Sequence, residues 1–193
     1  MSTDAVPRLT TLAEIEAEIW RQLEAAMVDK RHAWRAPVLA TVDGDGDGDG
    51  ADARTVVLRE VDARQKQLLT FTDDRSAKVA QLMRHPRATL VMWSPALGWQ
   101  LRCRVRLSLD VSGLAATSRW ARIKLTPAAQ DYLARLPPGV ELGAVEPPGA
   151  GPLQREYFAV IGAQVLAIDW LELHPSGHRR AMFDERGSRW LQP

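Results

Sequence analysis

The sequence predicts a mainly β protein with peripheral helices, in which five to seven antiparallel strands form a closed or half-closed barrel. The clearest evidence is the segment 99–109, WQLRCRVRLSL, where apolar residues alternate with polar and basic ones. Shorter runs rich in β-branched residues, each bounded by turn-forming residues, recur along the chain. Helical periodicity is limited to a few segments, which suit the periphery of such a sheet.

Composition and charge narrow the class of protein further. The 193 residues suit a single domain, and 46% hydrophobic with 25% charged residues is ordinary for a soluble globular chain. A net charge of +1 gives no overall field for nucleic acid or an anionic membrane, so we expect neither partner and any anion site must be local. Apart from one short Asp-Gly segment we find no internal repeat, and no linker is clear enough to separate two domains, so we treat residues 1–193 as one domain.

Cysteine usage and the apolar runs indicate the compartment. Cys103 is the one cysteine, which excludes an internal disulfide and suits a reducing environment. The first eight residues include an acid and no apolar run, so they do not resemble a signal peptide. No segment approaches the roughly 18 apolar residues of a membrane helix. We therefore expect a cytoplasmic protein.

The chain begins with an amphipathic helix over residues 9–31. Thr11 followed by Glu14 forms a capping box, and apolar residues from Leu12 onward recur at helical spacing. A short strand at 37–42 leads into a four-fold Asp-Gly repeat at 43–50, which predicts a flexible turn. The repeat does not fit a calcium loop, because position twelve would be Arg54 or Val56 rather than glutamate.

The remaining elements alternate short strands with short helices. Strands are expected over 53–61, 67–72, 87–93, 99–109, 157–173 (one or two strands), 179–183 and 189–191. Helices are expected over 76–84, 113–123 and 126–136, and an irregular Pro- and Gly-rich loop over 136–152.

The common catalytic motifs are absent, whereas anion-binding groups are plentiful. The four histidines are scattered without metal-ligand spacing, so we predict no metal site and name no catalytic residue. The segment 71–78, FTDDRSAK, leads from a strand end into a helix start. Its Thr72, Ser76 and Lys78, together with free helix N–H groups, suit a phosphate. The alternative is that Asp74 or Ser76 merely caps the helix.

Arginines flank this segment on both sides in the sequence. Arg54 and Arg59 stand at the two ends of the predicted strand 53–61 and would face opposite ways unless that strand twists or bulges. Arg102, Arg104 and Arg106 form the basic face of the strand 99–109. That face suits a solvated surface better than a nucleic-acid site, because the net charge is nearly neutral.

The order of these motifs resembles the FMN-binding proteins related to pyridoxamine 5'-phosphate oxidase. RTVVLR at 54–59 and FTxxxSxK at 71–78 are similar to the paired FMN-binding motifs of that family, and 99–106, Trp170 and 190–193 follow in family order. The match covers residues 37–193 and is nearest to a less characterised FMN-binding branch. The resemblance implies a split β-barrel homodimer, with FMN at the subunit interface and a small-molecule substrate.

Carried over residue by residue, the resemblance also implies a binding site. Thr72, Ser76 and Lys78 match phosphate-binding positions, and Trp170 matches a tryptophan beside the flavin ring. The residues expected to bind the cofactor are Arg54, Thr55, Val56, Val57, Arg59, Phe71, Thr72, Ser76, Lys78, Arg104, Trp170 and Arg180. Those expected to contact substrate are Arg179, Tyr132 and Arg135.

Two departures from the family pattern keep several functions open. Ala77 replaces a phosphate-binding arginine, for which Arg75 or Arg106 could compensate, and Arg104 stands where a glutamine commonly meets the flavin. An arginine there would stabilise the anionic reduced flavin and raise its potential. We expect an FMN-dependent oxidoreductase that works by hydride transfer. The alternatives are a non-catalytic flavin or pyridoxal-phosphate carrier, an authentic pyridoxamine 5'-phosphate oxidase, and a split barrel that binds haem or a deazaflavin.

Overall fold

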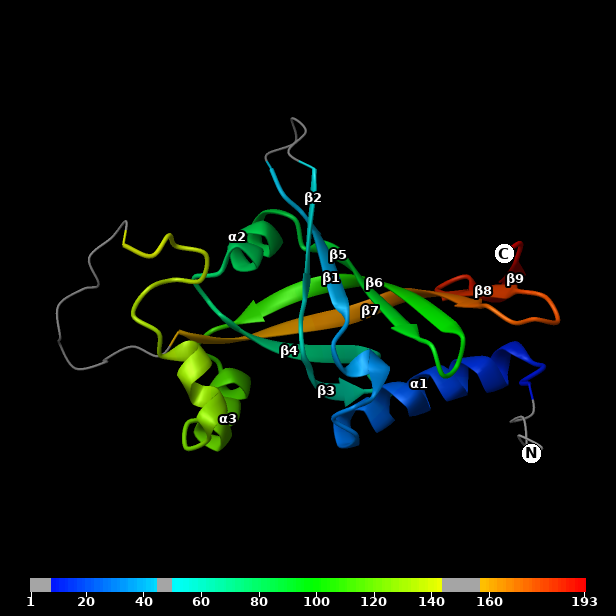
Figure 1. The fold of residues 1–193 in the computed structure, drawn as a ribbon, viewed down its shortest axis with the longest axis horizontal. Coiled ribbons are helices and arrows are strands. Elements are labelled where there is room, and N and C mark those ends of the chain that lie inside the picture. The colour runs from blue at the N-terminus through cyan, green and yellow to red at the C-terminus, as the bar shows by residue number, and fades with distance from the viewer. Residues whose placement is uncertain (1–7, 45–49, 144–156) are drawn as a thin grey trace.

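The computed structural model describes residues 8–44, 50–143 and 157–193. In these residues nine strands form one antiparallel sheet in the order β2-β1-β5-β6-β7-β4-β3, with β8 pairing β7 and β9 (Figure 1). The mainly β class is confirmed. The prediction of five to seven strands was too low, in part because the predicted strand 53–61 is two strands, and the sheet does not close. Residues 45–49 of the predicted Asp-Gly turn lie outside the described residues.

The element boundaries are as follows. The strands are β1 Val38–Val42, β2 Ala51–Thr55, β3 Leu58–Asp62, β4 Gln67–Asp73, β5 Arg87–Ser94, β6 Trp99–Asp110, β7 Phe158–Glu172, β8 Arg179–Asp184 and β9 Gly187–Leu191. The helices are α1 Leu12–Val28, α2 Ala77–Arg84 and α3 Leu114–Ile123, with 3-10 turns η1 Ala33–Arg35 and η2 Pro127–Tyr132.

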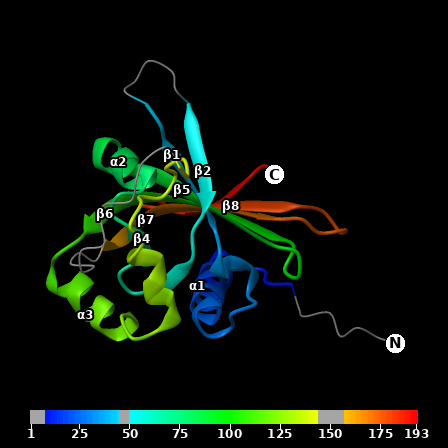
Figure 2. The ribbon, with the colours of Figure 1, turned by 60° about the vertical axis from the view of Figure 1, so that its left-hand side comes forward.

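The N-terminal helix α1 packs on the sheet as its periodicity predicts, although it is shorter than 9–31. Thr11 and Glu14 form both hydrogen bonds of the capping box. Ile15, Ile19 and Leu23 are fully buried in the main core. In both views α1 lies below β6 and β7 and α2 lies above them, while α3 lies at the end of the molecule away from β8 (Figures 1 and 2).

Strand β6 confirms the alternation seen in the sequence. Leu101 and Cys103 are completely buried in the core, whereas Arg104 and Arg106 on the opposite face are exposed. Burial raises the pKa of the Cys103 thiol to about 12, so it stays protonated and unreactive.

Strand β7 is one continuous strand that changes partners along its length. Its first half pairs with β4 and its second half with β8, while β6 runs along its other edge throughout. The register with β6 shifts between Arg104 and Val105, which leaves Leu166 as an extra, exposed residue. This bulge lies where the partner of β7 changes from β4 to β8, and a β-bulge bends the strand that carries it.

Two predicted elements differ in the structure. The predicted strand 53–61 breaks at Val56 and Val57 into β2 and β3, which lie at opposite ends of the sheet order. Val56 donates its N–H to Pro37 O at 2.9 Å and is buried, so the chain crosses between two partners there. The predicted helix 126–136 is instead a 3-10 turn over Pro127–Tyr132.

Candidate functional site

Three side chains of the predicted phosphate motif converge where β4 ends and α2 begins. Lys78 Nζ donates to Thr72 Oγ1 and to Ser76 Oγ, each at 3.0 Å, and the two hydroxyl oxygens are 3.1 Å apart. Thr72 and Ser76 are buried at 5% and 4% exposure. Ser76 is the N-cap residue of α2, but its hydroxyl caps no helix N–H group. The simple capping alternative therefore does not describe how Ser76 is used.

The electrostatics of this cluster favour an anion. The pKa of Lys78 is lowered, first by burial and then by the positive charge of Arg54 nearby. Among the described residues, no carboxylate lies within ion-pair distance of Lys78. A half-buried ammonium group beside a second cation, at the positive end of a helix, gains most from a bound phosphate or similar anion.

Arg54 approaches the same region from β2. Its guanidinium group bonds to Thr41, Asp52 and Gln81, which come from β1, β2 and α2 respectively. Its neighbours in the first predicted motif are split by the break between β2 and β3: Thr55 and Val57 are exposed, whereas Val56 is buried.

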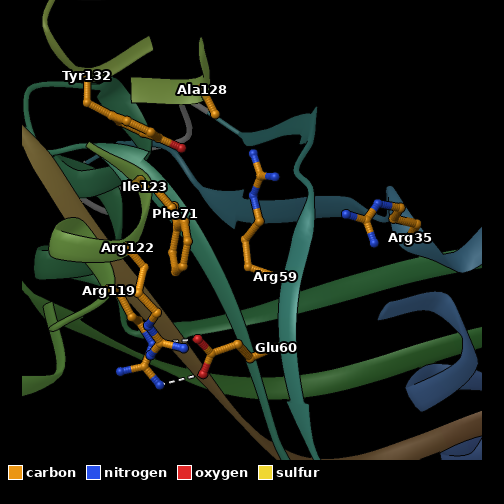
Figure 3. Close-up of a pocket in the computed structure, with 9 residues that line it drawn as sticks. All are labelled: Arg35, Arg59, Glu60, Phe71, Arg119, Arg122, Ile123, Ala128 and Tyr132. Carbon is orange, nitrogen blue, oxygen red and sulfur yellow. Dashed lines mark hydrogen bonds and ion pairs between the residues drawn. The ribbon is translucent and has the colours of Figure 1, made fainter. Parts of the chain in front are cut away.

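A second candidate site is a cavity of about 280 Å³ between β3, β4, α3 and η2 (Figure 3). Its lining residues are Arg35, Arg59, Glu60, Phe71, Arg119, Arg122, Ile123, Ala128 and Tyr132. The guanidinium carbon of Arg59 lies 5.8 Å from the centre of the Phe71 ring. Arg59 Nε is buried without a hydrogen-bond partner among the described residues. Burial raises the pKa of Tyr132, although the charge of Arg59 opposes the shift.

Two further arginines in this cavity were not expected from the sequence. Arg119 forms two hydrogen bonds with Glu60, at 2.9 and 2.5 Å, which join α3 to β3. Arg122 has no ion-pair partner in the described part of the chain. Arg119 and Arg122 are three residues apart on the predicted helix 113–123 and therefore lie on one face of it. This spacing is the feature of the sequence from which the pair could have been predicted. Figure 3 shows Phe71 between Arg59 and this arginine pair.

Other predicted site residues are engaged elsewhere. Arg75 forms a two-pronged ion pair with Asp73, donates to the carbonyls of Ala134 and Arg135, and stacks on Tyr157 at 3.3 Å. These contacts occupy its guanidinium group, and compensation for Ala77 by Arg75 or Arg106 stays a prediction. Arg135 is exposed and does not line the cavity.

The two arginines of β8 are both paired with carboxylates that are 5% exposed. Arg179 bonds to Glu172 at 2.8 and 2.9 Å and to Leu9 O at 2.6 Å, while Arg180 bonds to Asp169 at 2.9 and 2.7 Å. Neither lines one of the cavities described here.

Trp170 and Arg104 lie in contrasting surroundings. Trp170 is 0% exposed, with its ring centre 5.2 Å from that of Trp99 and 6.3 Å from that of Trp190. Arg104 lines a groove of about 1080 Å³ on the outer face of the sheet. A role for either beside a flavin remains a prediction.

The described residues contain no group of three potential metal ligands, and none of their helices is long and apolar enough to span a membrane.

The open sheet, its bulged central strand and its peripheral helices define the chain as a split β-barrel. Residues 17–109, just under half of the chain, match the model of the family described as pyridoxamine 5'-phosphate oxidase, FMN-binding domain. Over these residues the chain is similar to the FMN-binding domain of that family, in agreement with the resemblance of its motifs. The matched region contains both segments that resemble FMN-binding motifs, and with them Thr72, Ser76 and Lys78, here called the Lys78 cluster.

Solved structures extend the likeness to nearly the whole chain. A pyridoxamine 5'-phosphate oxidase-related, FMN binding protein from Nostoc punctiforme is 26% identical, with a TM-score of 0.67 over 92% of this chain and 96% of that one. PhzG from Burkholderia lata, solved with tetrahydrophenazine-1-carboxylic acid, shares the fold at 16% identity, with a TM-score of 0.71 over 97% and 99%. A heme binding protein from Mycobacterium smegmatis, 16% identical, has a TM-score of 0.53 over 91% of this chain and 59% of that one. A comparison with curated proteins found no match.

Proposed function

We propose that this protein is a flavoprotein that binds FMN, with the cofactor phosphate at Lys78, Thr72 and Ser76. The observation that carries this proposal is the convergence at the start of α2 of two buried hydroxyls and a half-buried ammonium group that forms no ion pair with the described residues. A phosphate dianion accepts hydrogen bonds from all of these groups and from the first helix N–H groups. The matched FMN-binding domain and the Nostoc relative support FMN as the source of that phosphate.

The reaction we propose is an oxidation–reduction of a small molecule by hydride transfer. Bound FMN would supply the redox chemistry by accepting or donating the hydride. The residues of the chain would bind and orient the reactants. The arginine-lined cavity at Arg59, Arg122 and Tyr132 supports a substrate with an anionic group. Phe71, which belongs to the second FMN-binding motif, lines the same cavity, so this motif borders both proposed sites.

We propose that two copies of the chain pair through the outer face of the sheet. The groove there crosses β1, β6, β7 and β8 and contains the exposed apolar residues Val42 and Leu166 together with Arg104. Exposed apolar side chains along a long groove favour burial against a partner. Arg104 would then lie at the subunit interface, which is where the resemblance to the FMN-binding family implies that FMN binds. A cytoplasmic location remains a prediction from the single, reduced cysteine.

The main alternative is a carrier that binds flavin without turnover, and it is favoured by the engagement of Arg179 in structural contacts. Anaerobic mixing of the FMN-loaded protein with NADPH or NADH separates the two functions. If the protein is an oxidoreductase, the flavin absorbance near 450 nm should fall within about seconds to minutes, which is the range of ordinary turnover rates. Admission of oxygen should then restore the absorbance. An absorbance that stays unchanged with both donors, and with pyridoxamine 5'-phosphate as substrate, would favour the carrier.

A further inference from the structure

Gln81 is a buried glutamine whose amide oxygen and amide nitrogen both take part in one polar network. The side chain is 2% exposed on α2. Its amide oxygen accepts from Thr41 Oγ1 at 2.7 Å and from Arg54 Nη2 at 2.8 Å. Its amide nitrogen donates to Asp52 Oδ2 at 2.9 Å. Because a buried amide is costly unless its hydrogen bonds are made, this network has one favoured arrangement.

The network fixes the guanidinium group of Arg54. Arg54 Nη1 donates to Thr41 Oγ1 at 2.5 Å and to Leu39 O at 3.3 Å, while Nη2 donates to Gln81 and Asp52. Four of the five N–H groups of the arginine thus have partners. The arginine loses its rotamer freedom before any ligand arrives, so a ligand need not bear that entropic cost.

Asp52 differs from the other partners because it is the charged and more exposed one. Its side chain is 40% exposed, whereas Thr41 and Gln81 are buried. The hydrogen bond from Gln81, and then those from Arg54, lower the pKa of Asp52, so the carboxylate is ionised at neutral pH. Its charge also acts on Lys78. A phosphate at Lys78 would therefore meet a competing anion at Arg54.

We propose that Gln81 positions Arg54 for the phosphate of the cofactor, and that Asp52 is an exchangeable counter-anion that the phosphate replaces at Arg54 Nη2. Gln81 and Thr41 keep the guanidinium group in place during the exchange, because both are buried. Asp52 can leave because it is partly exposed and lies on β2, at the end of the sheet order. This inference rests on the proposed function, since the phosphate is that of FMN.

The two roles predict opposite effects on one measurable ratio. Riboflavin lacks the phosphate, so the ratio of riboflavin to FMN dissociation constants reports on the phosphate site alone. Gln81→Met conserves volume but removes the network, and we expect FMN binding about ten-fold weaker with riboflavin binding little changed. Asp52→Asn keeps hydrogen-bonding groups but removes the charge, and we expect FMN binding several-fold tighter, because the competing anion at Arg54 is gone.

The experiment is a fluorescence titration of FMN and riboflavin into the full chain and each variant, with thermal unfolding measured in parallel. Gln65→Met and Asp62→Asn, at exposed positions, are the matched controls. If Gln81→Met fails to fold, Thr41→Val removes one end of the same network while conserving shape, and should also lower the ratio.

Each outcome decides a different claim. Equal losses of FMN and riboflavin affinity in Gln81→Met would mean a purely structural glutamine and overturn the positioning role. Weaker FMN binding in Asp52→Asn would overturn the exchange. Failure of the wild-type protein to bind either flavin would overturn the proposed function and this inference with it. FMN binding with an unchanged ratio in the variants would overturn the inference only.

Discussion

The ammonium group of Lys78 lies 3.0 Å from the hydroxyl oxygen of Thr72, so the start of α2 and the end of β4 meet at one point. The turn between them is stabilised by Asp73, whose carboxylate accepts from both the backbone and the side chain of Arg75. The phosphate motif therefore lies at a strand end and a turn that is fixed by hydrogen bonds, which favours a preorganised site.

Replacement of Lys78 should weaken FMN binding specifically. Lys78→Met removes the ammonium group but keeps the length of the side chain, and the loss of a charge-assisted hydrogen bond should cost about 1.5–3 kcal/mol of binding free energy. We expect FMN affinity at least about ten-fold lower by fluorescence titration. Lys30→Met, at an exposed position near the end of α1, is the control. Equal affinity in both variants would place the phosphate elsewhere.

The arginine-lined cavity should bind an anionic substrate independently of FMN. Arg59→Gln removes the guanidinium group next to Phe71. With pyridoxal 5'-phosphate as the probe, added to FMN-loaded protein, we expect about ten-fold weaker binding and FMN affinity within about two-fold of wild type. Arg31→Gln, at an exposed position, serves as the control. A loss of FMN affinity instead would assign Arg59 to the cofactor, as the sequence motif suggests.

Glu172 should be important for stability rather than for flavin binding. Its carboxylate accepts from Arg8, Arg179 and Trp99, and so joins the N-terminal segment to the ends of β6, β7 and β8. Glu172→Ala leaves these donors without their partner and should lower the free energy of unfolding by about 2–4 kcal/mol. Urea unfolding measures the loss, and FMN affinity of the folded variant should stay near wild type.

The Glu172 carboxylate should also make the free energy of unfolding depend on pH. Burial raises the pKa of Glu172, but hydrogen bonds from Arg179 and Arg8 outweigh burial and lower it overall. A lowered folded-state pKa means stability that is present above the unfolded pKa, about 4.3, and is lost as the pH falls through the folded value. Urea unfolding between pH 3 and 7 should show a steeper loss in wild type than in Glu172→Gln. Parallel curves would contradict this assignment.

The proposed dimer makes a prediction at the bulge of β7. Leu166 is 46% exposed and lines the outer groove. A charge at a buried interface is costly unless paired, so Leu166→Asp should shift a wild-type dimer toward monomer. Sedimentation velocity at micromolar concentration measures the change. A monomeric wild type would contradict the interface outright.

Local patterns in the sequence predicted those parts of the fold that depend on neighbours in the chain. The alternation in β6, the capping box of α1 and the clustering of Thr72, Ser76 and Lys78 all lie within a few residues. The break at Val56 was missed, because the three β-branched residues from Thr55 to Val57 favour a continuous strand and the crossing depends on distant partners.

The missed parts of the site depend on contacts that are distant in the sequence. Arg119 pairs with Glu60, 59 residues away, and the buried role of Gln81 depends on side chains from β1 and β2. Arg179 matched a substrate-binding position of the family. Its ion-pair partner Glu172 could not be predicted, because the two residues meet only through the pairing of β7 with β8. Sequence spacing predicts which groups can meet locally, not which groups neutralise one another.

The measurement that tests the central claim most directly is a titration of purified, ligand-free protein with FMN and, separately, with riboflavin. Fluorescence quenching gives both dissociation constants and the stoichiometry. We predict one FMN per chain and riboflavin binding at least about ten-fold weaker, because in the proposed site the Lys78 cluster would contact only the phosphate. Equal affinity for the two flavins, or no binding of either, would contradict a phosphate site at the junction of β4 and α2.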